Sequence, residues 1–166
     1  MNESILAIDP GAGGGMAWRS ETGEIAAVKM PEGVTEQCAA IRALHPAQVV
    51  VERVGTYMPG NSGPAAVSFA RHCGNLEGII VALGLPMIPP KGATPQTWQN
   101  TMGLTKHEPI DKALDPATRK RILAERKAQR KNEIKELMQR RYPHLKVTLA
   151  TADALGILTW AMEQTR

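Results

Sequence analysis

The sequence predicts an α/β fold in which one mixed sheet of five strands carries helices on both faces. Near the N-terminus, three short segments with strand character are separated by turn residues, which predicts an antiparallel three-strand meander. Further along, helical periodicity alternates with short apolar runs, as is typical of parallel strands joined by crossover helices. The 166 residues, 43% of them hydrophobic, suffice for one buried core. We therefore expect residues 1–166 to form a single domain.

The expected strands are short apolar runs that end at turn signals. They cover residues 5–8, 16–19, 24–30, 48–51 and 86–89, and residues 147–149 could add an edge segment. Helices are expected where apolar residues recur at helical spacing or where a capping residue precedes proline. They cover residues 34–44, 64–83, a short stretch from 94 to 98, 115–141 and 152–164.

A basic segment extends from residue 119 to residue 146. It holds eleven Lys and Arg against three Glu, a net charge of +8 within a chain whose formal charge is +4, so the remainder is net acidic. A basic segment on an acidic body favours a polyanionic partner such as nucleic acid, although a solvated helix face gives the same pattern. The side chains that could meet phosphates are Arg119, Arg126, Arg130, Lys131 and Lys135.

Three carboxylates stand at the ends of expected elements. Asp9 ends the first strand, Glu52 ends the strand after the first helix, and Asp153 lies in the first turn of the last helix. Ligands collect at the carboxyl ends of strands in open α/β sheets. If the strands that carry Asp9 and Glu52 are parallel neighbours, these two side chains lie together at one edge, where the last helix can place Asp153 beside them.

Clustered carboxylates repel one another, and a divalent cation removes that repulsion. An all-oxygen ligand set favours Mg²⁺, for which Mn²⁺ substitutes, over zinc or copper. Two such ions, roughly 3.5–4 Å apart, lower the pKa of an attacking water and stabilise the leaving oxygen of a phosphodiester. The three acids together therefore indicate metal-dependent phosphodiester hydrolysis.

Each acid also has a simpler explanation when it is taken alone. Asp9 before proline fits a turn, and Glu52 beside Arg53 fits a surface ion pair. Asp153 would suit the dipole of its helix. The placement of all three at element ends, together with the basic segment, favours the metal site.

A glycine-rich loop, Gly-Ala-Gly-Gly-Gly at residues 11–15, follows the first strand. It lacks the Lys-Ser/Thr pair of a P-loop, and a strand follows it where a dinucleotide-binding fingerprint needs a helix. We expect this loop to keep side chains away from the acids, so that a DNA backbone can approach them closely.

These segments resemble three motifs of the RuvC-type Holliday junction resolvases. The matching residues are 5–11 with 15–18, then 49–54, and finally 151–157. The Pro-x-x-Trp at 95–98 and the run 131–143 look like the phage branch of this family. The resemblance covers nearly the whole chain and implies an RNase H-like fold, a homodimer, and Mg²⁺ or Mn²⁺ at each active site. Each subunit would nick one strand of a four-way DNA junction.

Carried over by residue, the resemblance makes Asp9, Glu52 and Asp153 the acidic metal ligands. It also matches Lys131 to a basic residue near the scissile phosphate. The cellular enzymes have a further Asp three residues before the last acid, where this chain has Ala150. Either a neighbour such as Thr151 or a water takes that place, or catalysis is weakened or lost, by a natural or an engineered change.

A second departure concerns strand opening. The cellular enzymes carry an aromatic wedge three residues after the Glu, where this chain has Gly55. Tyr57, two residues further on, could stack on an unpaired base or could be an ordinary surface residue. The sequence therefore leaves strand opening and cleavage preference undecided.

Several other functions share some of these features. A proofreading exonuclease would need Glu at position 11, which is Gly here, and an actin-like ATPase would need a second domain and an adenosine site. A YqgF-like RNA-processing nuclease has similar motifs and stays open, as does a junction-binding protein that no longer cuts because of Ala150. We expect no small-molecule cofactor.

The cellular location follows from apolar runs and the N-terminus. Runs such as residues 79–85 are too short to span a membrane, and the acidic, polar start does not resemble a secretory signal. Cys38 and Cys73 lack metal-type spacing, so free thiols in a reducing cytosol are expected. We therefore expect a cytoplasmic protein, in the host cytoplasm if it is phage-encoded.

Overall fold

The computed structural model describes residues 3–54, 63–89, 92–104 and 107–164. Within these ranges the chain forms a four-stranded mixed sheet in the order β3-β2-β1-β4. The strands are β1 (Ile5–Asp9), β2 (Gly15–Arg19), β3 (Ile25–Lys29) and β4 (Gln48–Val51). β1, β2 and β3 pair antiparallel, and β4 runs parallel to β1. The predicted meander, the parallel strand and the mixed α/β class are confirmed.

The prediction of a fifth strand at residues 86–89 was wrong for the described part of the chain. There, Met87 makes only an isolated parallel bridge with Val49, and Ala93 makes another with Glu52. Prolines at 86 and 89 have no N–H to donate to a ladder, which explains why pairing does not extend into a strand. The expected edge segment at 147–149 is also absent, because helix α5 already begins at Leu149.

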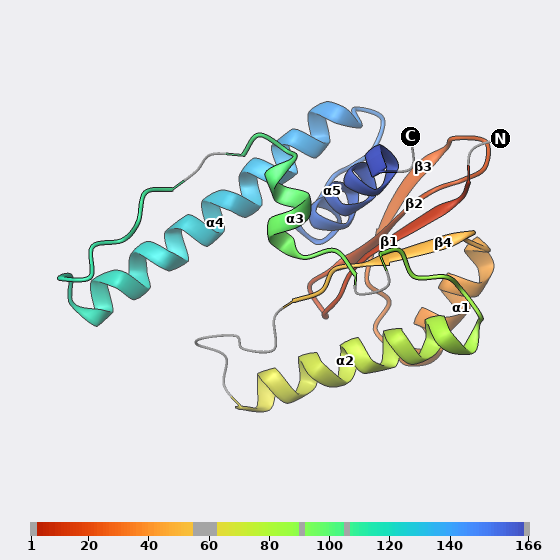
Figure 1. Cartoon of the computed structure of the whole chain (residues 1–166), viewed down its shortest axis with the longest axis horizontal. Helices are drawn as coiled ribbons and strands as arrows, with labels where there is room; N and C mark the ends of the chain where they lie inside the picture. Colours follow the sequence, from red (N-terminus) through yellow and green to blue (C-terminus); the bar gives the residue numbers. More distant parts are fainter. Residues whose placement is uncertain (1–2, 55–62, 90–91, 105–106, 165–166) are drawn as a thin grey trace.

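Helices cover both faces of the sheet, as predicted (Figure 1). On one face, α1 (Val34–Leu44) and α2 (Gly63–Ala82) enclose the alternate strand residues Leu6 and Ile8. On the other face, α5 (Leu149–Gln164) packs over Ile5 and Ala7 with the C-terminal half of α4 and with Trp98 of the short helix α3 (Pro95–Asn100). The period-two alternation of β1 thus divides its side chains between two cores.

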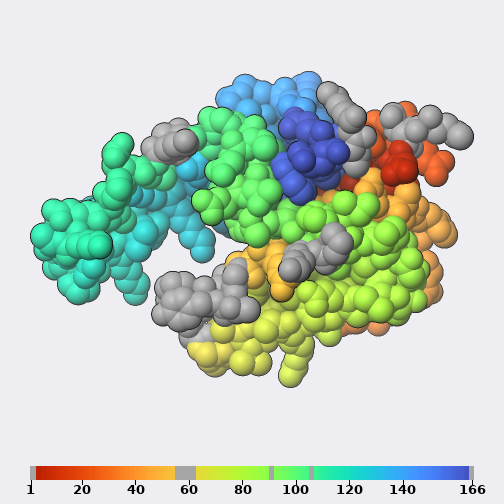
Figure 2. Space-filling view, viewed as in Figure 1, coloured from red at the N-terminus to blue at the C-terminus, as the bar shows by residue number. Residues whose placement is uncertain are grey.

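Helix α4 (Pro116–Arg141) packs along only part of its length. Its buried residues are Ile134 and Met138, both in the C-terminal half, whereas Leu123 in the N-terminal half is 58% exposed. Figure 2 shows that this N-terminal half projects from the body of the molecule. The predicted cap is confirmed, since the Asp115 carboxylate accepts from Thr118 N at 3.0 Å.

Helix α5 begins three residues before the predicted start. Thr151 explains the difference, because its hydroxyl accepts from Thr148 N at 3.0 Å and so satisfies a donor at the helix start. Among the described residues, none of the helices combines the length and apolar character needed to cross a membrane.

Candidate functional site

Strand register brings Asp9 and Glu52 together at the edge of the sheet. Ile8 of β1 pairs with Val51 of β4 in parallel register, and Glu52 N donates to Ile8 O at 2.8 Å. The next residue along each chain is therefore a carboxylate, and the two side chains interact directly, which raises the pKa of Asp9 and opposes the rise in the pKa of Glu52. The predicted juxtaposition of Asp9 and Glu52 is present in the structure.

Asp153 reaches the same place from α5. It lines one cleft together with Asp9 and Glu52, and its charge acts on both of them. The cleft has a volume of about 440 Å³ and lies between the loop after β1, helix α2 and helix α4. We call it the carboxylate cleft; its charged lining residues are Asp9, Glu52, Asp153, Lys127, Arg130 and Lys131.

Burial and mutual repulsion disfavour the charged forms of the acids in the carboxylate cleft. Burial, the charges of Glu52 and Asp153, and the hydrogen bond to Glu52 raise the pKa of Asp9 to about 8, against the opposing charge of Lys131. Burial also raises the pKa of Glu52 and of Asp153, and Lys131 opposes both shifts. Such a group of carboxylates gains from a bound cation, which favours their charged forms.

The chemistry of these donors suits a hard divalent cation. Three carboxylates offer only oxygen, the ligand type preferred by Mg²⁺ and Mn²⁺. No three His, Cys, Asp or Glu side chains in the described ranges are close enough to form a preformed metal cage. The arrangement is a hydrogen-bonded pair, Asp9 and Glu52, with Asp153 within electrostatic reach, so a cation would have to draw the third acid in.

Trp98 orients Glu52. Its indole Nε1 donates to Glu52 Oε1 at 2.8 Å, and this hydrogen bond lowers the pKa of Glu52 against the effect of burial. The ring is fully buried and lies against Gly156, where an added Cβ would come within 2.6 Å of it. Gly156 belongs to the helix that carries Asp153, so Trp98 contacts both Glu52 and the helix of a second acid. The sequence prediction gave Trp98 no such role.

The glycine-rich loop lines the carboxylate cleft with little more than backbone. Gly11, Gly13 and Gly14 all face it, and Gly11 has a φ of 110° that other residues rarely adopt. A Cβ at Gly14 would lie 2.1 Å from the carbonyl oxygen of Asp9. Glycine is therefore required at position 14 by close packing against the backbone of Asp9, and the role of the loop in admitting a DNA backbone stays a prediction.

Three cations of α4 border the acids. Lys127, Arg130 and Lys131 line the carboxylate cleft, and Lys131 opposes the raised pKa of each of the three acids. Sequence reasoning selected Arg130 and Lys131 but did not select Lys127. Its position four residues before Lys131, on the same helical face, was the available signal.

The other predicted phosphate contacts lie elsewhere. Arg119, Arg126 and Lys135 are not lining residues of the carboxylate cleft. Arg126 donates from its guanidinium to the carbonyl oxygen of Glu108, which ties the preceding segment to α4. Their contact with nucleic acid stays a prediction, and Tyr57 lies outside the described residues.

Ala150 lies in the first turn of α5, three residues before Asp153. Residues three apart lie on the same helical face, so an acid at this position would be a neighbour of Asp153. Its carbonyl oxygen lies so near β2 that a Cβ at Gly15 would come within 2.3 Å of it. Thr151 is not placed to act as a substitute ligand, because it is buried and its hydroxyl bonds to the backbone of Thr148.

A mixed sheet with this order and helices on both faces is similar to the fold of RuvC. Two solved structures from Thermus thermophilus are similar to this chain. RuvC in complex with Holliday junction substrate is 14% identical with a TM-score of 0.56, and a second RuvC structure is 16% identical with a TM-score of 0.52. Both alignments cover 98% of this chain and 96% of the other.

At these identities the likeness establishes the fold over nearly the whole chain. No protein-family model matches the sequence, and no curated protein matches it either. The assignment of a reaction therefore depends on the residues of the site.

Proposed function

We propose that this chain is a metal-dependent, structure-selective DNA endonuclease that resolves four-way (Holliday) junctions by paired nicks. The observation that carries the proposal is the convergence of Asp9, Glu52 and Asp153 in one cleft that Lys131 also enters. The RuvC-like fold supports it, because one of the similar solved structures is RuvC in complex with a Holliday junction substrate.

Asp9, Glu52 and Asp153 would hold the Mg²⁺ or Mn²⁺, with two ions per active site as the proposed number. The ions would supply charge neutralisation at the scissile phosphate and lower the pKa of the attacking water. Lys131 would bind a non-bridging phosphate oxygen, since it is the cation whose charge acts on all three acids. The side-chain-free loop at Gly13 and Gly14 would let the phosphate backbone approach the acids.

A homodimer is part of the proposal, because a junction of near two-fold symmetry suits a two-fold dimer. Helix α2 supports it. Only Leu76, Ile79 and Ile80 of this helix are buried, whereas Val67 is 63% exposed and Val81 is 75% exposed. A second copy that covered this helix would bury apolar surface that the single chain leaves in water.

The test is nicking of a labelled four-way junction and a matched linear duplex, with Mg²⁺, Mn²⁺ or EDTA. We expect paired nicks in the junction alone, abolished by EDTA and by Asp153→Asn. The matched control is Glu21→Gln, which neutralises an exposed carboxylate in the turn after β2 and should leave nicking unchanged. Cutting of structured RNA with none of DNA would replace the proposal with an RNA-processing nuclease.

Ala150 favours one second candidate, a junction-binding protein that no longer cuts. The Ala150→Asp variant separates the two functions, because it adds a carboxylate on the helical face of Asp153. Cutting by the original chain shows that three acids suffice. Cutting by the variant alone, with tight junction binding by both proteins, would assign the original chain a binding function.

A further inference from the structure

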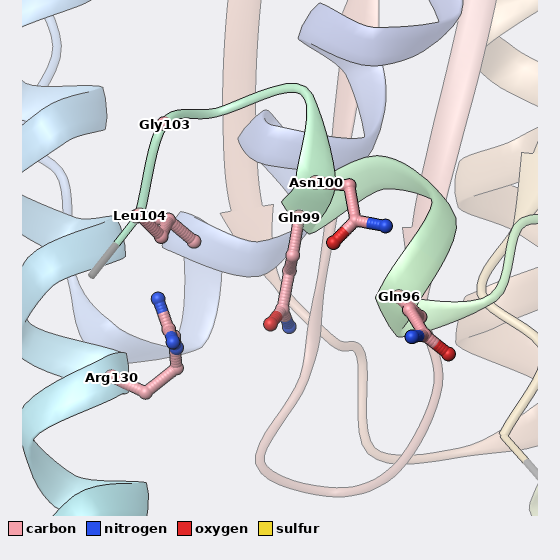
Figure 3. Close-up of a pocket in the computed structure, with 6 residues that line it drawn as sticks. All are labelled: Gln96, Gln99, Asn100, Gly103, Leu104 and Arg130. Carbon is pink, nitrogen blue, oxygen red and sulfur yellow. The ribbon is translucent and has the colours of Figure 1, made fainter. Parts of the chain in front are cut away.

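A second hollow lies beside the carboxylate cleft, between α3 and α4 (Figure 3). Its volume is about 560 Å³, within the range of roughly 300–1,000 Å³ typical of cavities that hold small molecules. We call it the amide groove; its lining residues are Gln96, Gln99, Asn100, Gly103, Leu104 and Arg130. Three of the six are amides, and all three belong to α3.

The amide groove adjoins the carboxylate cleft. Gln99 and Arg130 line both hollows, so ligands in the two would be neighbours. Gln96, Gln99 and Asn100 follow the i, i+3, i+4 spacing that places side chains on one helical face. Trp98 leaves the same helix on another side and donates to Glu52.

The face of α3 that carries the three amides has a fixed position relative to the acids. The Thr94 hydroxyl accepts from Thr97 N at 3.2 Å at the start of α3, and the Thr101 hydroxyl donates to Trp98 O at 2.8 Å at its end. Trp98 between them is fully buried. A ligand held by the amides would therefore stand in a defined place next to whatever the acids hold.

The lining chemistry suits a neutral hydrogen-bonding ligand better than a phosphate. A groove for phosphates would need several cations, whereas the one cation among these six lining residues, Arg130, already forms an ion pair with Glu133 at 3.3 Å. Side-chain amides carry donors and acceptors together, as the edges of nucleobases do. Hydrogen bonds within the described residues do not engage the side chains of Gln96, Gln99 or Asn100, which leaves these amides available to a ligand.

We infer that the amide groove is a base-recognition subsite that takes one unpaired nucleobase, next to the phosphate held at the acids. The inference rests on the proposed function for its neighbouring phosphate. Bases near a branch point can leave the stack, and enzymes read such extruded bases through amide and guanidinium hydrogen bonds. The subsite would make the chain selective for a base at one position beside the cut.

The test uses the full chain and four-way junctions with randomised nucleotides around the crossover. Bound junctions are recovered in Ca²⁺ or EDTA and sequenced, and nick positions are mapped separately in Mg²⁺. We expect one position with a base enriched at least about fivefold by both measurements, because one bidentate amide–base pair discriminates to that degree or more. The double substitution Gln96→Met with Asn100→Leu keeps side-chain size and removes both amides. It should reduce the enrichment below about twofold.

The matched control is Asn132→Leu, which removes an exposed amide from α4 outside both hollows. It should leave the base preference unchanged. An original chain without base preference, or a double variant that keeps the preference, overturns the inference. A third outcome is that no form nicks, while the original chain shows a base preference in binding that the double variant loses. This outcome supports the subsite and contradicts the proposed nuclease function. A chain that binds no junction overturns both.

Discussion

The two halves of α4 carry similar charge but stand in different surroundings. The C-terminal half buries Ile134 and Met138 against the body and holds Lys131 beside the acids. The N-terminal half projects into solvent, where Leu123 is mostly exposed and Arg119 lies outside the carboxylate cleft. The packed half therefore holds Lys131 at a defined place beside the acids. Under the proposed function, cations of the projecting half that lie outside the cleft, such as Arg119, would contribute only to a positive field.

Substituting one cation from each half separates these two roles most clearly. We expect Lys131→Ala to slow junction nicking by about 10²–10³, the usual effect of removing one positioned electrostatic group. Arg119→Ala should slow nicking by less than about threefold at saturating junction, because its charge acts only at long range. Single-turnover nicking rates measure both, and equal effects would contradict the division of α4.

The apolar residues of the two halves provide the corresponding test of stability. Ile134→Ala empties a fully buried site and should lower the free energy of unfolding by about 2–4 kcal/mol. Leu123→Ala should change it by less than about 0.5 kcal/mol, since that side chain is mostly exposed. Denaturant unfolding followed by circular dichroism gives both values. A large loss for Leu123→Ala would show that the projecting half is packed after all.

The acids opposite the packed half should make cation binding depend on pH. With a pKa of about 8, Asp9 carries a proton at neutral pH in the metal-free protein, and an incoming cation must displace it. Mn²⁺ affinity should therefore rise about tenfold per pH unit from pH 6 to about pH 8 and then level off. Calorimetry in buffers of different ionisation enthalpy should detect about one released proton below pH 8. Affinity that stays constant over this range would exclude a protonated Asp9.

Trp98 should influence metal binding more than stability. Trp98→Phe keeps an aromatic ring against Gly156 but removes the donor to Glu52, so Mn²⁺ affinity should fall about tenfold, as for other groups that orient a ligand. Trp160→Phe is the control, because it removes a buried indole from the same core and keeps the hydrogen bond to Glu52. Calorimetric titration with Mn²⁺ compares the two variants, and equal affinities would reduce Trp98 to a packing residue.

The smallest expected effect concerns the projecting half alone. Arg119→Ala should weaken junction binding a few-fold at low salt. It should also reduce the slope of log affinity against log salt by about one, without changing which junctions are preferred. Fluorescence anisotropy across a salt series measures the slope. An unchanged slope would mean that Arg119 meets no phosphate.

Much of the fold followed from local sequence patterns. The apolar runs of β1 and β4 and the turn residues between β1, β2 and β3 fixed a short list of pairings, and Asp115 and Thr94 marked helix starts that the structure confirms. The expected fifth strand was wrong because strand propensity did not weigh the missing donors of Pro86 and Pro89. These prolines leave room only for isolated bridges.

The candidate site was predictable where it depends on register and unpredictable where it depends on packing. Asp9 and Glu52 meet because each comes one residue after the last parallel pair, Ile8 and Val51, which the apolar runs of the sequence indicate. The hydrogen bond from Trp98 to Glu52 joins residues 46 positions apart, and it depends on how α3 docks against Gly156. No local pattern encodes that docking. The Pro-x-x-Trp motif could therefore be recognised in the sequence, but the contact of Trp98 with Glu52 could not be predicted.

The part of α4 that precedes Lys131 also sets a length scale for any bound duplex. Residues 116–130 form about 15 residues of helix, which at 1.5 Å per residue reach roughly 22 Å. Duplex DNA advances about 3.4 Å per base pair, so this reach corresponds to about six base pairs. A nuclease footprint on a junction arm should therefore extend about that far beyond the contact with Lys131. Arms trimmed shorter than this should bind as if the projecting half of α4 were absent.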